Sequence, residues 1–292
     1  MPGRLTVGQV ALNHLIHVRI VAGQPEKITK MEKYLEFAKN LAKEAEKIAL
    51  RYFSFEVDST WKEDNTPLTK ADTEINDLVI KRINEAYPKH SIYGEEKSDR
   101  KESSKHIWVC DPIDGTMAFS CGLPIFVFSI ALVNESNGLP VLGLINDPIM
   151  KTMYWATKGG GAYRNEKRIY VSKSETFLNT YTLTGASGRD VGFSNLPVHE
   201  QLGMKKSKVM KFPSFIYGAI QIANGKFVGG AFYKKHAHDI AALKIITEEA
   251  GGKVTDLNGN ERRYDEDGIG CIVSNRILHC ELLEVVQSGK LK

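Results

Sequence analysis

The sequence predicts a mixed α/β fold made of two closely packed halves that divide near residue 172. Apolar residues recur at helical spacing over 32–86, and short apolar runs separated by glycine, proline and asparagine follow over 107–171. Both patterns mix over 214–286. With 42% hydrophobic and 25% charged residues, the composition is that of a globular protein and excludes a disordered or fibrous chain.

The first thirty residues differ from the rest, because they contain no acidic residue before Glu26. Transit peptides are also poor in acids, but their usual serine enrichment is missing here. We expect residues 1–30 to be a disordered extension outside the fold. The N-terminal half then covers 31–172 and the C-terminal half 173–292.

Two amphipathic helices are expected before residue 90. Apolar residues between Glu32 and Phe53 share one helical face. Thr69-x-x-Asp72 is typical of a capping box, in which two side chains bind the free backbone N–H groups of a helix start. Pro88 ends the helix that follows.

Strands dominate the next segment, and the C-terminal part combines helices with a strand. Asn137-Gly138 is typical of a hairpin turn. The expected strands are Ile107–Cys110, Ile125–Val133, Val141–Ile145, Met153–Trp155, Ile169–Val171 and Cys271–Val273. The expected later helices are Ser214–Asn224, Asp239–Ala250 and Leu278–Val286.

Charge and cysteine usage narrow the functional classes. Lys and Arg number 39 against 35 Asp and Glu, and so weak an excess predicts no nucleic-acid partner. No apolar run approaches the roughly 18 residues of a membrane span. The four cysteines show no C-x-x-C spacing, so we expect reduced thiols in a cytoplasmic protein.

The most informative segment is Trp108-Val-Cys-Asp111-Pro-Ile-Asp114-Gly115-Thr116. A hydrophobic strand leads into two aspartates, the proline is expected to end the strand, and the glycine permits a tight turn into a helix. Two carboxylates there need a cation between them. Oxygen ligands favour Mg²⁺, which suits the hydrolysis of a phosphate ester. The alternative is that Asp111 and Asp114 bind no metal and only form a turn and cap a helix.

Three further acidic positions belong to the same hypothesis. Glu95 stands in the loop Gly94-Glu95-Glu96, Asp72 in the capping box, and Asp239 at a helix start. Each has a structural alternative, which is solvated surface for the glutamate and a helix cap for the two aspartates.

Taken together, these motifs resemble the inositol monophosphatase family of Mg²⁺-dependent, lithium-sensitive phosphatases. The matching segments are Asp111-Pro-Ile-Asp-Gly-Thr116, Gly94-Glu95-Glu96, and His238-Asp239-Ile-Ala-Ala242 followed by Glu249-Ala-Gly-Gly252. The resemblance covers about residues 32–286. It implies the layered αβαβα sandwich of the sugar and inositol phosphatases.

The resemblance also implies two or three Mg²⁺ ions per site. Glu95, Asp111 and the carbonyl of Ile113 would hold the first ion. Asp111, Asp114 and Asp239 would hold the second, and Glu95 would support a weaker third.

The remaining implied roles concern water and phosphate. Asp72 and Thr116 would orient and deprotonate the attacking water, and backbone N–H groups of Gly115 and Thr116 would bind the phosphate. The implied catalytic residues are Asp72, Glu95, Asp114 and Thr116. The implied substrate-binding residues are Asp114, Gly115, Thr116 and Asp239.

The sequence departs from the family pattern where the substrate is expected. A polyol-binding Glu usually precedes the last metal-binding Asp by seven residues, but Phe232 stands there, so strong selectivity for inositol phosphate is not expected. Lys234 and Lys235 are expected either to meet a second anionic group or to form a solvated loop. His238 replaces the family's Trp and keeps a packing role. Zinc at His236-x-His238 is not favoured, because no Cys lies nearby.

We therefore expect a Mg²⁺-dependent phosphatase that hydrolyses a small phosphate monoester of the inositol-1-phosphate class with metal-activated water. Segments 118–124 and 140–145 resemble the histidinol-phosphate phosphatase branch, and fructose-1,6-bisphosphate and 3′-phosphoadenosine nucleotide phosphatases share parts of them. A non-catalytic role with the transcription machinery is the alternative from another class. Similar proteins are usually dimers, so we expect a cytoplasmic homodimer with no nucleic-acid or membrane partner.

Overall fold

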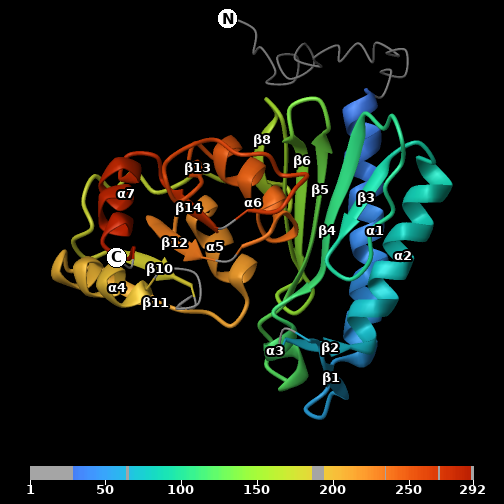
Figure 1. The fold of residues 1–292 in the computed structure, drawn as a ribbon, viewed down its shortest axis with the longest axis horizontal. Helices are drawn as coiled ribbons and strands as arrows, with labels where there is room; N and C mark the ends of the chain where they lie inside the picture. The colour runs from blue at the N-terminus through green and yellow to red at the C-terminus, as the bar shows by residue number, and fades with distance from the viewer. Residues whose placement is uncertain (1–28, 64–65, 186–193, 234, 269, 291–292) are drawn as a thin grey trace, which may run out of the picture.

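Five layers, in the order helix, sheet, helix, sheet, helix, make up the structure (Figure 1). The computed structural model describes residues 29–63, 66–185, 194–233, 235–268 and 270–290. The predicted αβαβα sandwich is confirmed. Over these described ranges, no helix is both long and apolar enough to cross a bilayer.

The first two layers come from the N-terminal part of the chain. Helices α1 and α2 pack together on one face of a seven-stranded sheet of order β3-β4-β5-β6-β7-β8-β9. Strands β3 and β4 run parallel, and the other neighbours run antiparallel. The elements are α1 Lys30–Tyr52, β1 Ser59–Trp61, β2 Pro67–Thr69, α2 Lys70–Ala86, β3 Ser91–Gly94, β4 His106–Asp114, α3 Thr116–Ser120, β5 Val127–Asn134, β6 Leu139–Asp147, β7 Thr152–Thr157, β8 Gly161–Arg164 and β9 Lys167–Arg168.

The remaining layers come from the C-terminal part. A five-stranded sheet of order β11-β10-β12-β14-β13 has α5 and α6 on the side facing the larger sheet and α4 and α7 on its other side (Figure 1). Helix α4 and strands β10 to β13 were not predicted. The elements are β10 Tyr181–Thr184, α4 Asn195–Met204, β11 Lys208–Met210, α5 Phe215–Ala223, β12 Gly229–Tyr233, α6 Ala237–Glu249, β13 Lys253–Thr255, β14 Gly270–Ser274 and α7 His279–Gln287.

Both predicted N-terminal helices begin with a capping box. The Thr29 side chain accepts a hydrogen bond from the Glu32 backbone, and the glutamate accepts one from the Thr29 N–H. Thr29 and Lys30, expected to lie in the extension, are therefore part of the fold, whereas residues 1–28 lie outside the described residues. The capping box of Thr69 and Asp72 is confirmed at the start of α2.

Two strand predictions are wrong in detail. Strand β4 does not end at Pro112 but continues to Asp114, because its pairing with β5 shifts between Asp111 and Asp114 and places the proline in an irregularity that needs no N–H donor. Residues 169–171 form no strand. Ile169 is buried in the core instead, and the last strand of the sheet is β9.

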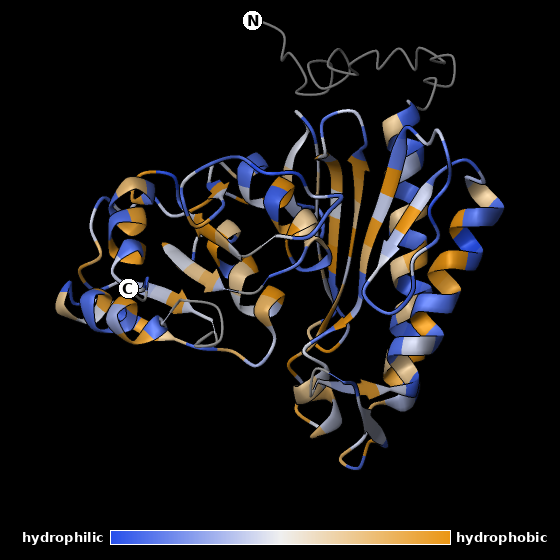
Figure 2. Cartoon of the chain, viewed as in Figure 1, coloured by the Kyte–Doolittle hydropathy of each residue, from blue (hydrophilic) through white to orange (hydrophobic). Residues whose placement is uncertain are grey.

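Within the described residues, three apolar cores hold the layers together, and the largest surrounds α5 and α6 between the two sheets. Figure 2 shows orange, apolar positions along the strands and on the helices between the sheets. Helix α6 is buried over most of its length, which explains its apolar sequence. Its first turn reaches the carboxyl end of β4, and this contact creates the site described next.

Candidate active site

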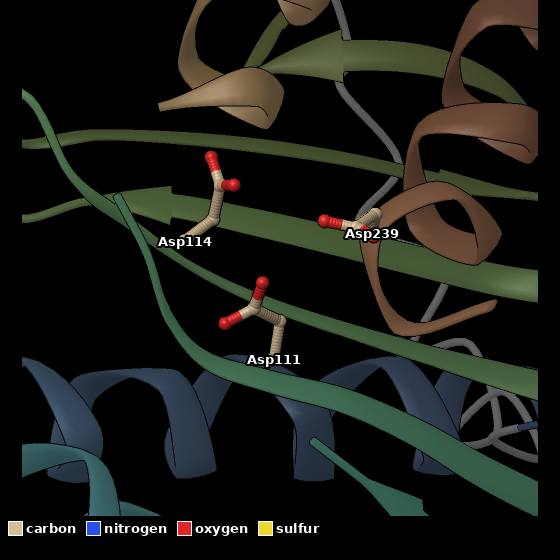
Figure 3. A group of neighbouring side chains, drawn as sticks. All are labelled: Asp111, Asp114 and Asp239. Carbon is tan, nitrogen blue, oxygen red and sulfur yellow. The ribbon is translucent and has the colours of Figure 1, made fainter. Parts of the chain in front are cut away.

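Three aspartates from two distant parts of the chain meet at the end of β4. Asp111 and Asp114 extend from β4, and Asp239 extends from the first turn of α6. One carboxylate oxygen from each lies within 4.8 Å of the others, and Figure 3 shows the three side chains facing a common space. All three are at most 6% exposed.

The charges of this group are not balanced by its own residues. Burial raises the pKa of Asp111 well above its ordinary value, and the negative charges of Glu95 and Asp114 raise it further. The Oδ1 atom of Asp111 is buried and has no hydrogen-bond partner among the residues that the structure describes. A buried carboxylate oxygen normally has one, so a cation that accepts oxygen ligands fits the chemistry of this group.

Asp114 is also held by α5, which belongs to the C-terminal part of the chain. Its carboxylate accepts hydrogen bonds from the Ser214 hydroxyl and from the N–H groups of Phe215, at 3.3 Å, and Ile216, at 2.7 Å. Burial raises the pKa of Asp114 to about 6, although these hydrogen bonds oppose the rise. Ser214 was predicted only as a helix start; its side chain in fact bonds to the site.

Gly115 permits the close approach of β4 and α5. Its φ of 99° lies in the left-handed region, which glycine tolerates best. A Cβ atom at this position would come within 2.7 Å of both the Ile125 carbonyl oxygen and the Ser214 Cβ. Any larger residue would therefore displace the turn that carries Asp114 and Thr116.

Asp239 has a cationic partner in Lys235, whose Nζ lies 3.1 Å from Oδ1. The His236 N–H donates to the other carboxylate oxygen at 2.7 Å. Burial opposes ionisation of Asp239, but Lys235 outweighs it and the pKa of Asp239 lies below its ordinary value. Lys235 is thus a partner of the acidic group and not a solvated loop residue, whereas Lys234 lies outside the described residues. His238 packs edge-on against Tyr93 at 6.1 Å, as its expected packing role requires.

Asp72 and Thr116 lie side by side next to the acidic group. The Thr116 hydroxyl is 3.2 Å from Asp72 Oδ1 and 2.9 Å from the Ile113 carbonyl oxygen, and its one proton can go to only one of them at a time. Thr69 donates to Asp72 Oδ2 from its N–H, at 2.9 Å, and from its hydroxyl. Burial raises the pKa of Asp72 to about 6.

Glu95 lines the same pocket but is not among the three carboxylates that meet. Lys62, in the connection after β1, lies 3.0 Å from Glu95 and 2.5 Å from Glu96. Lys62 was not predicted from the sequence, because 33 residues separate it from Glu95 and no local pattern marks it.

The acidic group opens into a pocket of about 390 Å³ between the two sheets. Seven of the eight residues predicted for the site line it, and Asp72 lies buried behind Thr116. Aromatic and basic residues from the C-terminal part form much of the rest. These include Lys211, Phe212, Phe215, Phe232 and Lys235.

Comparisons with known proteins bear on the family and fold of the chain. The family model described as the inositol monophosphatase family matches residues 30–291. A histidinol-phosphatase of Chlorobaculum parvum is 33% identical over 260 residues, which cover 88% of this chain and 97% of that protein. An inositol-1-monophosphatase of Mesorhizobium japonicum is 30% identical over 223 residues, covering 75% of this chain and 82% of that protein.

A solved structure gives the same result for the fold. The IMPase of Thermotoga maritima superposes with a TM-score of 0.78 at 28% identity, covering 87% of this chain and 97% of that one. The predicted fold type and phosphatase class are confirmed. The chain therefore belongs to the inositol monophosphatase family and is a phosphoric monoester hydrolase.

Proposed function

We propose that the chain is a Mg²⁺-dependent phosphatase that hydrolyses a small phosphate monoester with a metal-activated water. The observation that supports this most directly is the buried Oδ1 of Asp111, which lies among three carboxylates and has no partner within the described part of the chain. An oxygen-only set of ligands suits Mg²⁺ better than zinc or copper, which favour nitrogen and sulfur.

Three of the proposed ligands are the aspartates that meet in the structure, and Glu95 and the Ile113 carbonyl are proposed from the family resemblance. Asp111, Asp114 and Asp239 would hold one ion, and Glu95, Asp111 and the Ile113 carbonyl another, with a third on Glu95. When bound, Mg²⁺ neutralises the phosphate charge and lowers the pKa of a water molecule.

The chain's own residues orient the reactants. Thr116 and Asp72 form a hydroxyl–carboxylate pair beside the pocket, so the carboxylate is placed to take a proton that the hydroxyl relays from water. Lys235 and the N–H groups of Gly115 and Thr116 would bind the phosphate. Because Ser214 and the first turn of α5 hold Asp114 from behind, its carboxylate stays aimed at the acidic group.

From the family resemblance, the first substrate candidate is an ester of the inositol-1-phosphate class. Histidinol phosphate is the second candidate, because the Chlorobaculum relative is named for it and is 33% identical over most of both chains. We further propose a cytoplasmic homodimer whose chain divides near residue 172, which lies between β9 and β10.

A substrate panel with and without Mg²⁺ tests the proposal. Inositol 1-phosphate, histidinol phosphate, fructose 1,6-bisphosphate and a 3′-phosphoadenosine nucleotide are assayed for phosphate release, and Mg²⁺ binding is measured by calorimetry. Asp239→Asn is expected to weaken both. Asp77→Asn, which alters an exposed ion pair of α2, is the matched control and should change neither. Hydrolysis that persists after complete chelation would remove the proposed mechanism.

A further inference from the structure

Three phenylalanines form one side of the pocket, and we call them the aromatic wall. Phe215 and Phe232 are buried and meet edge to face, with ring centroids 4.5 Å apart. Phe212 is half-buried and packs directly over Gly218, where a Cβ atom would come within 2.9 Å of its ring. All three line the same pocket as Asp111, Asp114 and Asp239.

The charges around the pocket divide into two groups. Among the described lining residues, every carboxylate belongs to the acidic site, namely Glu95, Asp111, Asp114 and Asp239. Two lysines also line the pocket. Lys235 pairs with Asp239, and its Nζ lies 4.8 Å from the centroid of the Phe215 ring, whereas Lys211 immediately precedes Phe212. The Lys211 side chain is exposed and makes no ion pair or hydrogen bond with the described residues.

A polyol is poorly suited to the part of the pocket that the aromatic wall forms. Each hydroxyl placed against an apolar wall loses a hydrogen bond to water without replacing it. A flat ring loses nothing there, because its face and edge match the arrangement that aromatic side chains prefer with each other. A pocket with apolar walls and a few polar groups is also the usual form of a small-molecule site.

We propose that the leaving group of the natural substrate carries a flat aromatic ring, which packs on the aromatic wall, and an anionic group that reaches Lys211. The inference rests on the phosphatase function proposed above, and among small phosphate monoesters it favours a ring-bearing ester over the inositol-1-phosphate class. It places the reacting phosphate at the acidic site and the ring against Phe212, Phe215 and Phe232. A substituent that bears a positive charge is disfavoured, because it meets Lys211.

The test uses esters whose alcohols have similar intrinsic reactivity. Benzyl phosphate and cyclohexylmethyl phosphate differ in flatness, and 4-carboxybenzyl and 4-(aminomethyl)benzyl phosphate differ in charge. With Mg²⁺ present, kcat/KM for benzyl phosphate should exceed that for the cyclohexyl ester by about two- to tenfold. The carboxylated ester should be the best of the four and should also exceed inositol 1-phosphate. Binding of benzylphosphonate and cyclohexylmethylphosphonate, measured by calorimetry, gives the same comparison without turnover.

Two variants test whether Phe212 and Lys211 cause these substrate preferences. Phe212→Leu should bring the ratio of the kcat/KM values for the benzyl and cyclohexylmethyl esters close to one. Phe37→Leu, at a remote position that is also partly buried, should leave this ratio unchanged. Lys211→Met should lower the ratio of carboxylated to plain benzyl ester by about two- to fivefold, and Lys208→Met, at an exposed lysine three residues earlier, should not. Both rates in each ratio are measured on the same preparation. A loss of folded enzyme lowers both rates equally and therefore leaves the ratio unchanged.

The outcomes separate the two proposals. If the wild type hydrolyses these esters with Mg²⁺ but prefers the cyclohexyl ester, the aminomethyl ester or inositol 1-phosphate, the inference is wrong and the phosphatase proposal stands. If no ester is hydrolysed with Mg²⁺, both fail.

Discussion

Replacing Asp72 by Asn should make the metal-free protein more stable and, at the same time, inactive. Burial raises the pKa of Asp72 to about 6 from an ordinary 3.8, so folding favours its neutral form. Asn has nearly the same shape. Its carbonyl can accept from Thr69, and its amide can donate to Thr116, whose own proton then goes to Ile113.

The magnitude follows from the two pKa values. Above pH 6 the folded protein carries a buried charge, and at 1.36 kcal/mol per pKa unit this costs roughly 3 kcal/mol. The cost falls to roughly 1.5 kcal/mol at pH 5 and disappears below the unfolded pKa, because both states are then protonated. The neutral Asn never incurs this cost. The advantage of Asp72→Asn should therefore grow as pH rises from 4 to 7.

Urea unfolding in EDTA at pH 5, 6, 7 and 8 measures this difference. Other buried acids titrate in both proteins, so their contributions to the difference in the free energy of unfolding cancel to first order. Asp77→Asn on the exposed side of α2 is the control and should change the free energy of unfolding by less than about 0.5 kcal/mol at every pH. Turnover by Asp72→Asn with Mg²⁺ should fall by about 10²–10⁴-fold. A variant less stable than wild type at pH 8, or an advantage that does not change with pH, would refute the reasoning.

Three further predictions concern the acidic group. Asp114→Asn should lower kcat by on the order of 10²-fold or more at saturating Mg²⁺, because it removes a ligand charge next to the phosphate, and a near wild-type rate would contradict its proposed role. Chelation should abolish activity and Mg²⁺ should restore it, while inhibition by Li⁺, expected from the family resemblance alone, is checked by titrating LiCl into the assay. Lys235→Met should lower the free energy of unfolding of the metal-free protein by about 1–3 kcal/mol, because Asp239 loses its cation. In thermal unfolding, Mg²⁺ should then raise the unfolding temperature of this variant more than that of the wild type.

Local patterns predicted the elements that depend on local interactions. The capping box of α2, the helix over 30–52 and the hairpin at Asn137-Gly138 all follow from residues close in sequence. Strands β10 to β13 escaped prediction because they are short, from three to five residues, and are defined by pairing with distant strands. The apolar run Ile169–Val171 was misassigned for the same reason, since core burial and strand pairing favour the same residues.

The residues of the site also divide into those predicted from local motifs and those that depend on tertiary packing. The carboxylates were predicted from their motifs, and the structure brings three of them together, while their roles as ligands remain predictions. Lys62 and Ser214 were missed because each meets its acidic partner only through tertiary packing. The position of Phe232 was predicted from spacing, but its contact with Phe215 was not, because that contact joins β12 to the start of α5.

Helix α6 has a consequence for how the protein is made. It covers the seven-stranded sheet on the face opposite α1 and α2, yet it leaves the ribosome about a hundred residues after β6. Until then Val109, Ala131 and Ile145, which α6 and its neighbours bury, face water. Asp239 arrives on the same helix, so the segment that completes the core also completes the acidic group. Nascent and truncated chains therefore expose an aggregation-prone sheet and lack the full set of carboxylates, which confines the site to chains whose synthesis has passed residue 249.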